Sequence, residues 1–493
     1  MKASSGFSHT GLHLDLRIQV MPIAALRKMA HEVAAAGLNT LMIEWEASYP
    51  FEKHAIISNQ YAYTRDEIMD FIEECCGLGV EVIPLQQCFG HVEYILRHER
   101  YAHLRESRKD LCQVCPCRGA EAVAVFREIF QDLVAMHPSR YLHIGGDETY
   151  LLGQCPECQA RAAEVGKSRL YTDYFQKIAA EVMRLGKRPI VWADMLLKYP
   201  EAAAEMPEGT VFMDWNYGWD VNHFGDLSKV RSDRFEFWGA PALRAHPDNH
   251  SLATWKTHFE NFRDFIPFAR KSDYRGLILT SWSTSGIYGY EWEMPGEAKR
   301  LFPMRRVYPL GGFRILLDAF SQAALNTLTF DPAKFVQDYA QLRFGLMAAE
   351  GKRLWQALTT NEETVTPGNV VAPALQKARR AQRLLAAMKP AKHRTEFQHL
   401  QLMADLRLQD LLVKEWERKL QSSWYTAARQ AQAAEGLAQL LRETDDLNRH
   451  FRQLNRQALH PGEMEEEINY RTVKLRELHA RVSRQGRQAP RQK

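Results

Sequence analysis

Short apolar runs alternate with longer amphipathic runs through the first two thirds of the chain. The short runs predict buried strands at 12–18, 39–44, 80–85, 141–144, 189–192, 210–214, 235–238 and 276–280. The long runs predict helices at 22–36, 64–78, 121–136, 168–185, 254–270 and 310–324. Eight strands separated by helices predict an α/β protein, a (β/α)8 TIM barrel. The alternative, a doubly wound sheet, usually carries a Gly-rich phosphate turn, which this sequence lacks.

The strand pattern ends at about residue 331, and only helical periodicity follows. It predicts helices at 373–388, 394–421, 424–451 and 463–482. Heptads are not sustained, which favours a helical bundle over a long coiled coil. We therefore expect a barrel over 1–330, an all-α helical domain over 331–483 and a disordered basic tail over 484–493.

Composition narrows the class of protein. Of the 493 residues, 45% are hydrophobic and 25% charged, the balance of a soluble globular protein. The net charge, 64 − 60 = +4, is too close to neutral to indicate nucleic-acid binding. No apolar run is long enough to predict a membrane span, and the first residues lack the apolar core of a secretion signal. We expect a cytoplasmic protein with no nucleic-acid or membrane partner.

Two Cys-x-x-Cys pairs stand out among the eight cysteines. Cys112 and Cys115 form one pair, and Cys155 and Cys158 form the other, so the four are candidate ligands of a tetrahedral zinc ion. The gap between the pairs is wider than in common zinc ribbons, and a set of reduced, half-buried thiols is the alternative. With Cys117 nearby, five thiols leave no open coordination position, so any zinc here would be structural rather than catalytic. No cofactor is predicted.

Polar and aromatic residues gather where the predicted strands end, which is where barrels of this kind carry function. At 143–148 the sequence His-Ile-Gly-Gly-Asp-Glu breaks a strand with two glycines and continues with Asp147 and Glu148. A solvated acidic turn is the simpler interpretation of such a pair alone. Further strand-end residues are Asp15, Arg17, Glu44, Glu46, His91, Trp192, Asp194, Asp214, Trp215, Asn216, Tyr217, Trp238 and Trp282. Aromatic faces suit pyranose rings and carboxylates accept hydrogen bonds from hydroxyls, so the pattern favours a sugar site.

The 143–148 segment resembles the catalytic signature of glycoside hydrolase family 20, the β-N-acetylhexosaminidases, and in particular its shorter members related to hexosaminidase D. The resemblance covers roughly residues 10–300 and is strongest at 39–52, 63–91 and 143–153. It implies exo-acting removal of terminal β-linked N-acetylglucosamine or N-acetylgalactosamine with retention. In this family the 2-acetamido oxygen of the substrate attacks C1 and forms an oxazolinium ion, so no enzyme nucleophile is needed.

The resemblance also implies roles for single residues. Glu148 would protonate the leaving oxygen and then activate water, while Asp147 would orient the acetamide and stabilise its developing charge. We expect the neighbouring carboxylate of Asp147 to raise the pKa of Glu148. His91 matches the histidine that follows the third strand. The tryptophans that match the acetamide pocket are Trp192, Trp215 and Trp282.

The chain also departs from the family pattern. Thr10 precedes Gly11 where larger relatives have an arginine that grips sugar hydroxyls, and Thr284 stands where they have a glutamate. Their seventh-strand tyrosine is replaced in 235–238, so Tyr217 is the candidate to contact the acetamide oxygen. Other candidates to contact the sugar are Asp15, Glu44, Glu46, Trp238, Glu291 and Glu293. The preference between the two amino sugars stays open.

The missing hydroxyl-gripping residues motivate an alternative function, a non-catalytic barrel that binds an amino sugar. In either case the expected partner is a small molecule or oligosaccharide that ends in N-acetylhexosamine. In relatives, the segment after the barrel packs against it or forms a dimer contact, so a homodimer is a further expectation.

Overall fold

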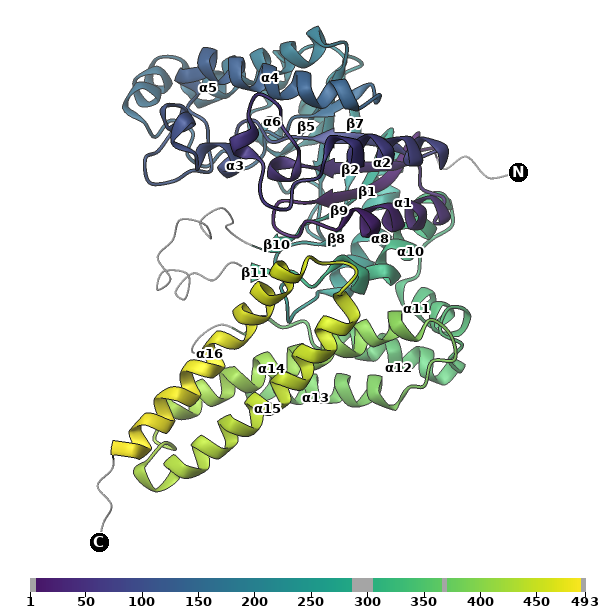
Figure 1. The fold of residues 1–493 in the computed structure, drawn as a ribbon. Coiled ribbons are helices and arrows are strands. Elements are labelled where there is room, and N and C mark those ends of the chain that lie inside the picture. The colour runs from purple at the N-terminus through teal and green to yellow at the C-terminus, as the bar shows by residue number, and fades with distance from the viewer. Residues whose placement is uncertain (1–5, 286–304, 366–369, 489–493) are drawn as a thin grey trace.

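A computed structural model describes residues 6–285, 305–365 and 370–488 of the chain, with a barrel in the N-terminal part and a group of long helices in the C-terminal part (Figure 1). The barrel strands are β1 (His9–Asp15), β2 (Thr40–Glu44), β3 (Glu81–Leu85), β4 (Tyr141–His143), β5 (Arg188–Trp192), β6 (Val211–Trp215), β7 (Glu236–Ala240) and β9 (Gly276–Ser281). Each pairs in parallel with the next, and pairing of β1 with β9 closes the barrel. The predicted TIM barrel is confirmed. A short strand, β8 (Ala242–Arg244), continues β7 beyond Pro241 and pairs with the end of β9.

The first strand lies earlier in the chain than the predicted 12–18. It begins at His9 because its pairing with β9 starts there, His9 opposite Gly276. It ends at Asp15, where the backbone N–H of Arg17 donates to Asp15 Oδ1 at 2.9 Å and turns the chain. The polar residues His9 and Thr10 hide the strand start from a pattern that counts apolar positions.

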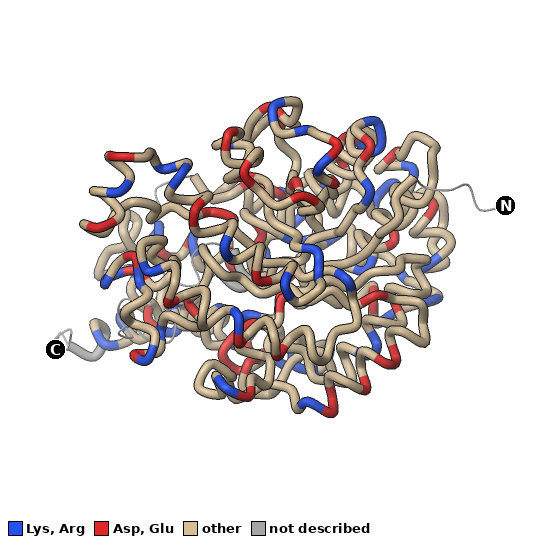
Figure 2. The backbone as a smooth tube through the Cα atoms, turned by 90° about the horizontal axis from the view of Figure 1, so that it is seen from above, with Lys and Arg blue, Asp and Glu red and all other residues tan. Residues whose placement is uncertain are grey.

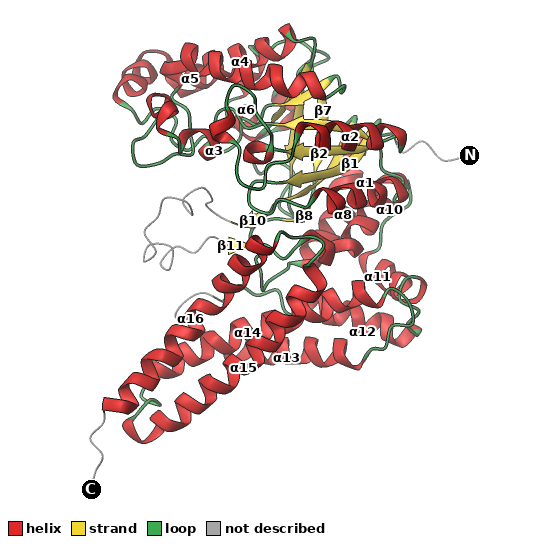
Figure 3. Cartoon of the chain, viewed as in Figure 1, coloured by secondary structure: helices red, strands yellow, loops and turns green. Residues whose placement is uncertain are grey.

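Helices cover the outside of the strands (Figure 3). The long ones are α1 (Ile23–Ala35), α2 (Arg65–Gly77), α4 (Gly119–Met136), α5 (Pro156–Arg184), α8 (Trp255–Lys271) and α10 (Arg314–Leu325), and the short ones are α3 (Glu93–Leu96), α6 (Asp194–Lys198) and α7 (Pro200–Ala204). A capping box formed by Thr64 and Glu67 begins α2. Helix α5 begins at Pro156 rather than at 168, because Cys155 caps a first segment that a non-helical Gly166 interrupts. A small ribbon of β10 (Thr284–Ser285) and β11 (Arg305–Arg306) lies near the barrel mouth.

The C-terminal part is all-α as predicted. Its helices are α11 (Pro332–Leu342), α12 (Ala348–Thr359), α13 (Ala372–Ala387), α14 (Arg394–Leu420), α15 (Gln430–Asn455) and α16 (Pro461–Gln488). The sequence pattern predicted neither α11 nor α12, because its first C-terminal helix begins at 373. Helix α16 runs five residues into the segment predicted to be disordered from 484, because Val482 still packs against the distal bundle and the helix continues past it. Residues 489–493 lie outside the described part.

The helical part packs on the barrel. The backbone N–H of Val20 donates to Glu463 Oε1 at 2.8 Å, and Tyr308 OH lies 2.8 Å from His399 Nδ1. One hydrophobic core runs from the barrel helices into α11 and α12, while the far ends of α14, α15 and α16 form a second cluster that extends away from the barrel (Figure 1). Basic and acidic positions are interspersed over the chain (Figure 2). Within the described residues, no helix is both long and apolar enough to span a membrane.

Candidate active site

The segment after β4 turns across the C-terminal end of the barrel. Gly145 and Gly146 have φ values of 68° and 98°, which side-chain-bearing residues rarely adopt. A Cβ on Gly145 would lie 1.7 Å from Gln87 Oε1, and one on Gly146 would lie 2.4 Å from the ring of Phe175. The two glycines are therefore required both for the turn and for close packing, and the turn delivers Asp147 and Glu148 to the mouth of the barrel.

His91 joins the two carboxylates. Its Nε2 lies 3.2 Å from Asp147 Oδ2 and 3.3 Å from Glu148 Oε2, so one imidazole bridges both acids. His91 and Glu148 have positive φ values of 55° and 48°, and Glu46 nearby has 43°. Residues without glycine's freedom adopt such angles at a cost of about 1–3 kcal/mol each, and this strain clusters at functional sites.

The predicted rise in the pKa of Glu148 is wrong for this structure. Burial raises that pKa, but the hydrogen bond and charge of His91 outweigh burial and hold the pKa of Glu148 below its ordinary value. Burial favours the neutral imidazole, yet Asp147 and Glu148 together raise the pKa of His91 well above its ordinary value. His91 therefore lies between two carboxyl groups that favour its protonated form, an arrangement that sequence adjacency of the two acids does not reveal.

Asp194, at the start of α6, fixes the position of Glu148 and Trp215 through hydrogen bonds. The backbone N–H of Glu148 donates to Asp194 Oδ2 at 3.1 Å, and Trp215 Nε1 donates to Asp194 Oδ1 at 3.4 Å. Burial and the charge of Asp147 raise the pKa of Asp194 to about 7. The sequence identified Asp194 only as a strand-end residue, and the structure gives it a positioning role.

The three predicted pocket tryptophans lie together. The rings of Trp192 and Trp282 are 5.9 Å apart. Trp192 belongs to the hydrophobic cluster inside the barrel, and Trp215 and Trp282 pack against that cluster. Trp282 Nε1 donates to Tyr217 OH at 2.8 Å, and Tyr217 lies 5.0 Å from the ring of Trp215. Trp192 Nε1 and Asp147 Oδ1 are buried and find no hydrogen-bond partner among the described residues. A buried polar atom without a partner is costly, so these atoms indicate a site that a ligand completes.

Asp15 and Arg17 form a second polar group at the end of β1. Asp15 accepts from Arg17 through both oxygens and from the N–H and hydroxyl of Ser283, and the guanidinium holds the pKa of Asp15 near 2 although burial opposes this. We predicted that Asp15 contacts a sugar. In the structure both of its carboxylate oxygens already accept hydrogen bonds from Arg17 or Ser283, so they are not available to a sugar hydroxyl. Asp15 instead positions Arg17, whose guanidinium carbon lies 5.1 Å from the centre of the Trp282 ring.

Glu44 and Glu46 lie beside Arg17. Glu44 is fully buried and contacts His13 Nε2 at 3.1 Å and Arg17 Nε at 3.5 Å. Glu46 is buried as well, and its Oε1 has no partner among the described residues. Burial raises the pKa of Glu46 well above its ordinary value, although the charge of Arg17 opposes this.

Trp238 was predicted to contact the sugar, and the structure contradicts this. It is fully buried in the middle of β7, stacks on His9 at 4.6 Å and donates through Nε1 to Glu236 at 2.7 Å. His9 begins β1, so this stack lies at the N-terminal end of the barrel, opposite the site. The prediction placed Trp238 at the end of its strand, but β7 continues to Ala240. Glu291 and Glu293 lie outside the described residues.

Tyr150 was missed in the sequence analysis. Its hydroxyl hydrogen-bonds Glu148 and lowers the pKa of that carboxyl, although its side chain is 72% exposed. His13 was missed as well, and it lies beneath Trp282 with ring centres 4.7 Å apart. In the sequence, only the nearness of Tyr150 and His13 to predicted strand ends could have marked them as site residues.

Two groups among the described residues have the spacing of metal ligands. His91, Asp147 and Glu148 form one, and their contacts are accounted for by the ion pairs described above. Glu106, Cys115, Cys155 and Cys158 form the other. The fourth predicted cysteine, Cys112, is not in this group, because its thiol hydrogen-bonds Asp110 instead.

Comparison with known proteins agrees with this geometry. The model of the glycosyl hydrolase family 20 catalytic domain matches residues 7–225. Hexosaminidase D of Bos taurus is 29% identical over 288 residues, 55% of this chain and 83% of the relative. Hexosaminidase D of Homo sapiens is 27% identical over 332 residues, 64% and 68% of the two chains. A crystal structure of a β-N-acetylhexosaminidase shares the fold at 18% identity with a TM-score of 0.50, covering 69% of this chain and 78% of that one.

These likenesses favour an enzyme over a non-catalytic sugar-binding barrel. The domain match includes the His91 loop, the Asp147–Glu148 turn and the strands that carry Trp192 and Trp215. The chain is a glycoside hydrolase, and its residues 7–225 match the catalytic domain of glycosyl hydrolase family 20.

Proposed function

We propose that this enzyme is an exo-acting β-N-acetylhexosaminidase that works with retention and substrate assistance. The observation that carries the proposal is the unpaired, buried Oδ1 of Asp147 beside Glu148 at the tryptophan-lined mouth of the barrel. An acetamide N–H is a donor that suits this acceptor, and the flat acetamide suits a wall of indole rings. The names of the relatives, hexosaminidases, agree with such a substrate.

In the proposed reaction, protonated Glu148 gives its proton to the glycosidic oxygen while the acetamido oxygen attacks C1. The aglycone leaves as an alcohol and a cyclic oxazolinium ion forms, whose positive nitrogen the carboxylate of Asp147 stabilises. Glu148, now a carboxylate, takes a proton from water as the water oxygen adds to C1. The ring opens, and the sugar is released with its β configuration retained.

Arg17 and Glu46 are the proposed contacts for the remaining sugar hydroxyls. They lie just beyond the ends of the neighbouring strands β1 and β2. Arg17 lies beside Trp282, and Glu46 Oε1 is an unpaired acceptor within the described structure. A guanidinium that donates and a carboxyl that accepts can together bind two adjacent hydroxyls. This pair would replace the arginine and glutamate that the sequence lacks relative to larger members of the family.

The test measures hydrolysis of p-nitrophenyl N-acetyl-β-glucosaminide and its galactosaminide epimer by wild type and Glu148→Gln. We expect wild type to cleave at least one, and the variant to lose about 10²–10⁴-fold in kcat, the usual contribution of an acid–base group. Glu121→Gln, an exposed position in α4, is the matched control and should behave as wild type.

Two outcomes contradict different parts of the proposal. Folded wild type that binds N-acetylglucosamine tightly but cleaves neither substrate would contradict hydrolase activity on amino sugars. An active enzyme that an oxazoline-type inhibitor does not inhibit would contradict substrate assistance and leave the specificity intact.

A further inference from the structure

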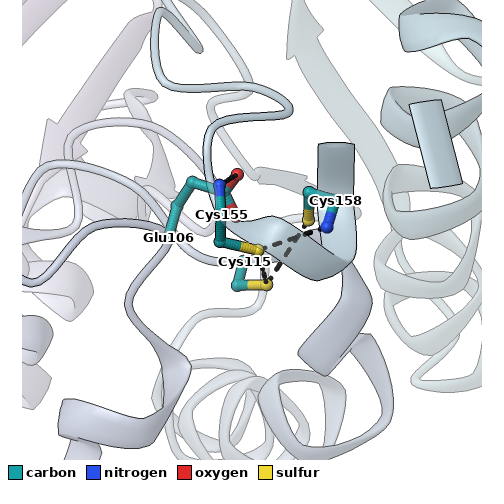
Figure 4. Close-up of side chains that lie close together, drawn as sticks. All are labelled: Glu106, Cys115, Cys155 and Cys158. Carbon is teal, nitrogen blue, oxygen red and sulfur yellow. Dashed lines mark hydrogen bonds between the residues drawn. The ribbon is translucent and has the colours of Figure 1, made fainter. Parts of the chain in front are cut away.

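Three thiols from two distant segments meet beside the loops that carry the active site. Cys115 Sγ lies 3.6 Å from Cys155 Sγ and 3.5 Å from Cys158 Sγ (Figure 4). Cys115 follows the loop after β3, whereas Cys155 and Cys158 begin α5 after β4. Cys115 and Cys158 are buried, and Cys155 is half-buried.

These distances fit a metal ion better than a disulfide. In a tetrahedral zinc site with Zn–S bonds of about 2.3 Å, two sulfurs lie about 3.8 Å apart. A disulfide bond holds its sulfurs at about 2.05 Å. One thiol placed almost equally far from two others, at close to the edge length of the tetrahedron, matches three corners of a zinc site.

Glu106 provides the fourth donor. Its Oε1 accepts from the backbone N–H groups of Gln154 and Cys155, at 2.7 and 2.9 Å, which fixes the carboxylate beside the thiols. Its Oε2 is buried without a partner in the described structure, and a ligand atom of Glu106 lies within 4.8 Å of all three sulfurs. A buried carboxylate oxygen aimed at a group of thiols is costly unless a cation is bound there.

We propose that Cys115, Cys155, Cys158 and Glu106 bind a structural zinc ion. Thiolate-rich tetrahedral sites select zinc, and four protein donors leave no position open for a substrate. This set differs from the four candidate cysteines of the sequence, since Glu106 takes the place of Cys112. The proposal does not depend on the hydrolase activity of the barrel.

The ion would fasten together the two loops that carry the catalytic group. The backbone N–H of Leu151 donates to Gln113 Oε1 at 2.9 Å, and Val114 N–H donates to Phe89 O at 3.0 Å. These bonds connect the thiol group to the turn after Glu148 and to the loop of His91. Zinc is therefore expected to stabilise both loops without taking part in the reaction.

The first experiment measures metal in the intact wild-type protein purified from zinc-containing medium and dialysed without chelator. We expect about one zinc per chain, and replacement by Co²⁺ should produce the intense visible absorption of tetrahedral cobalt thiolate. Neither readout requires a variant to fold. Absence of zinc together with absence of the cobalt spectrum would overturn the proposal, as would an intramolecular disulfide between Cys115 and Cys155 or Cys158.

Variants then identify the ligands. Cys158→Ser should lose the zinc and lower the melting temperature, whereas Cys112→Ser and the exposed Cys76→Ser should keep one equivalent. Glu106→Gln should weaken zinc binding in competition with a chelator, and Cys117→Ser should not. Full zinc retention by Cys158→Ser, or loss in Cys112→Ser alone, would overturn the assignment of the site.

Discussion

Each end of the barrel interior contains a buried tryptophan, and the two differ in whether the indole N–H makes a hydrogen bond. At the N-terminal end Trp238 stacks on His9, and its indole N–H donates to Glu236. At the C-terminal end Trp192 is equally buried, yet its indole N–H has no partner among the described residues. One tryptophan has its hydrogen bond within the fold, and the other does not.

Whether a buried polar atom has a hydrogen-bond partner distinguishes the core from the site better than residue type or burial does. Both tryptophans are nearly inaccessible, so exposure alone would assign both to the core. Unpaired buried atoms, positive φ values and opposed charges occur together at the C-terminal end, around Asp147, Glu148 and His91. Such costs persist where function requires them.

Among the variants that test this comparison, Asp147→Asn has the largest expected effect. The amide can still fill the space, but it cannot stabilise the positive charge on the oxazolinium nitrogen, so kcat should fall by about 10²–10³-fold, the range for losing one electrostatic contact. Steady-state kinetics on the nitrophenyl glycoside checks this. Asp214→Asn is the control, because Asp214 is also buried but accepts from Tyr274 on the outside of the barrel. If Asp214→Asn lost as much kcat as Asp147→Asn, the distinction between site and core would be contradicted.

Exchange of one tryptophan at each end tests the comparison directly. Trp192→Phe should raise KM about tenfold through lost aromatic contact with the acetamide. It should lower the free energy of unfolding by less than Trp238→Phe does, because the indole N–H of Trp192 has no hydrogen bond to lose among the described residues. Trp238→Phe should leave KM unchanged but lower the free energy of unfolding by roughly 1–3 kcal/mol, from the cavity and the lost bond to Glu236. Denaturant melts and kinetics on both variants provide the measurement. The comparison fails if Trp238→Phe changes KM more than Trp192→Phe does.

The fold was largely predictable because strand and helix patterns are local. Each of the eight barrel strands overlaps its predicted run, and the errors lie at their ends, as at His9 and Ala240. The position of a candidate site residue was predictable where that residue lies at or soon after the end of its strand, as Trp192, Asp147 and Glu148 do. Trp238 was misplaced because β7 continues two residues beyond it, which moves the side chain away from the mouth of the barrel and into its interior.

What could not be predicted depends on distances between segments. The ion pairs of His91 lower the pKa of Glu148, although adjacency to Asp147 predicted a rise. The bonds from Arg17 and Ser283 occupy Asp15, and nothing in the local sequence shows that Ser283 reaches it. The position of Glu106 among the thiols is of the same kind, because no spacing rule connects it to Cys115.

His91→Gln tests the balance of charges at the site through pH. Removing the imidazolium leaves Glu148 with burial and Asp147, both of which favour its protonated form, so its pKa should rise. A general acid must be protonated in the free enzyme, so the alkaline limb of the kcat/KM profile should move to higher pH. His103→Gln, whose ring pairs with Glu121 on the surface, is the control. A limb that stays in place or moves to lower pH would contradict the assigned role of His91.

The smallest expected effect comes from Tyr150→Phe. The Tyr150 hydroxyl lowers the pKa of Glu148 by one hydrogen bond, which His91 exceeds with both a hydrogen bond and a charge. The alkaline limb should therefore move in the same direction as in His91→Gln but by less, and stability should change by less than about 0.5 kcal/mol because the side chain is exposed. Tyr425→Phe, whose hydroxyl bonds Gln485 far from the barrel, should leave the profile unchanged. A larger shift in Tyr150→Phe than in His91→Gln would mean that an exposed hydroxyl, rather than the buried imidazolium, sets the charge state of Glu148.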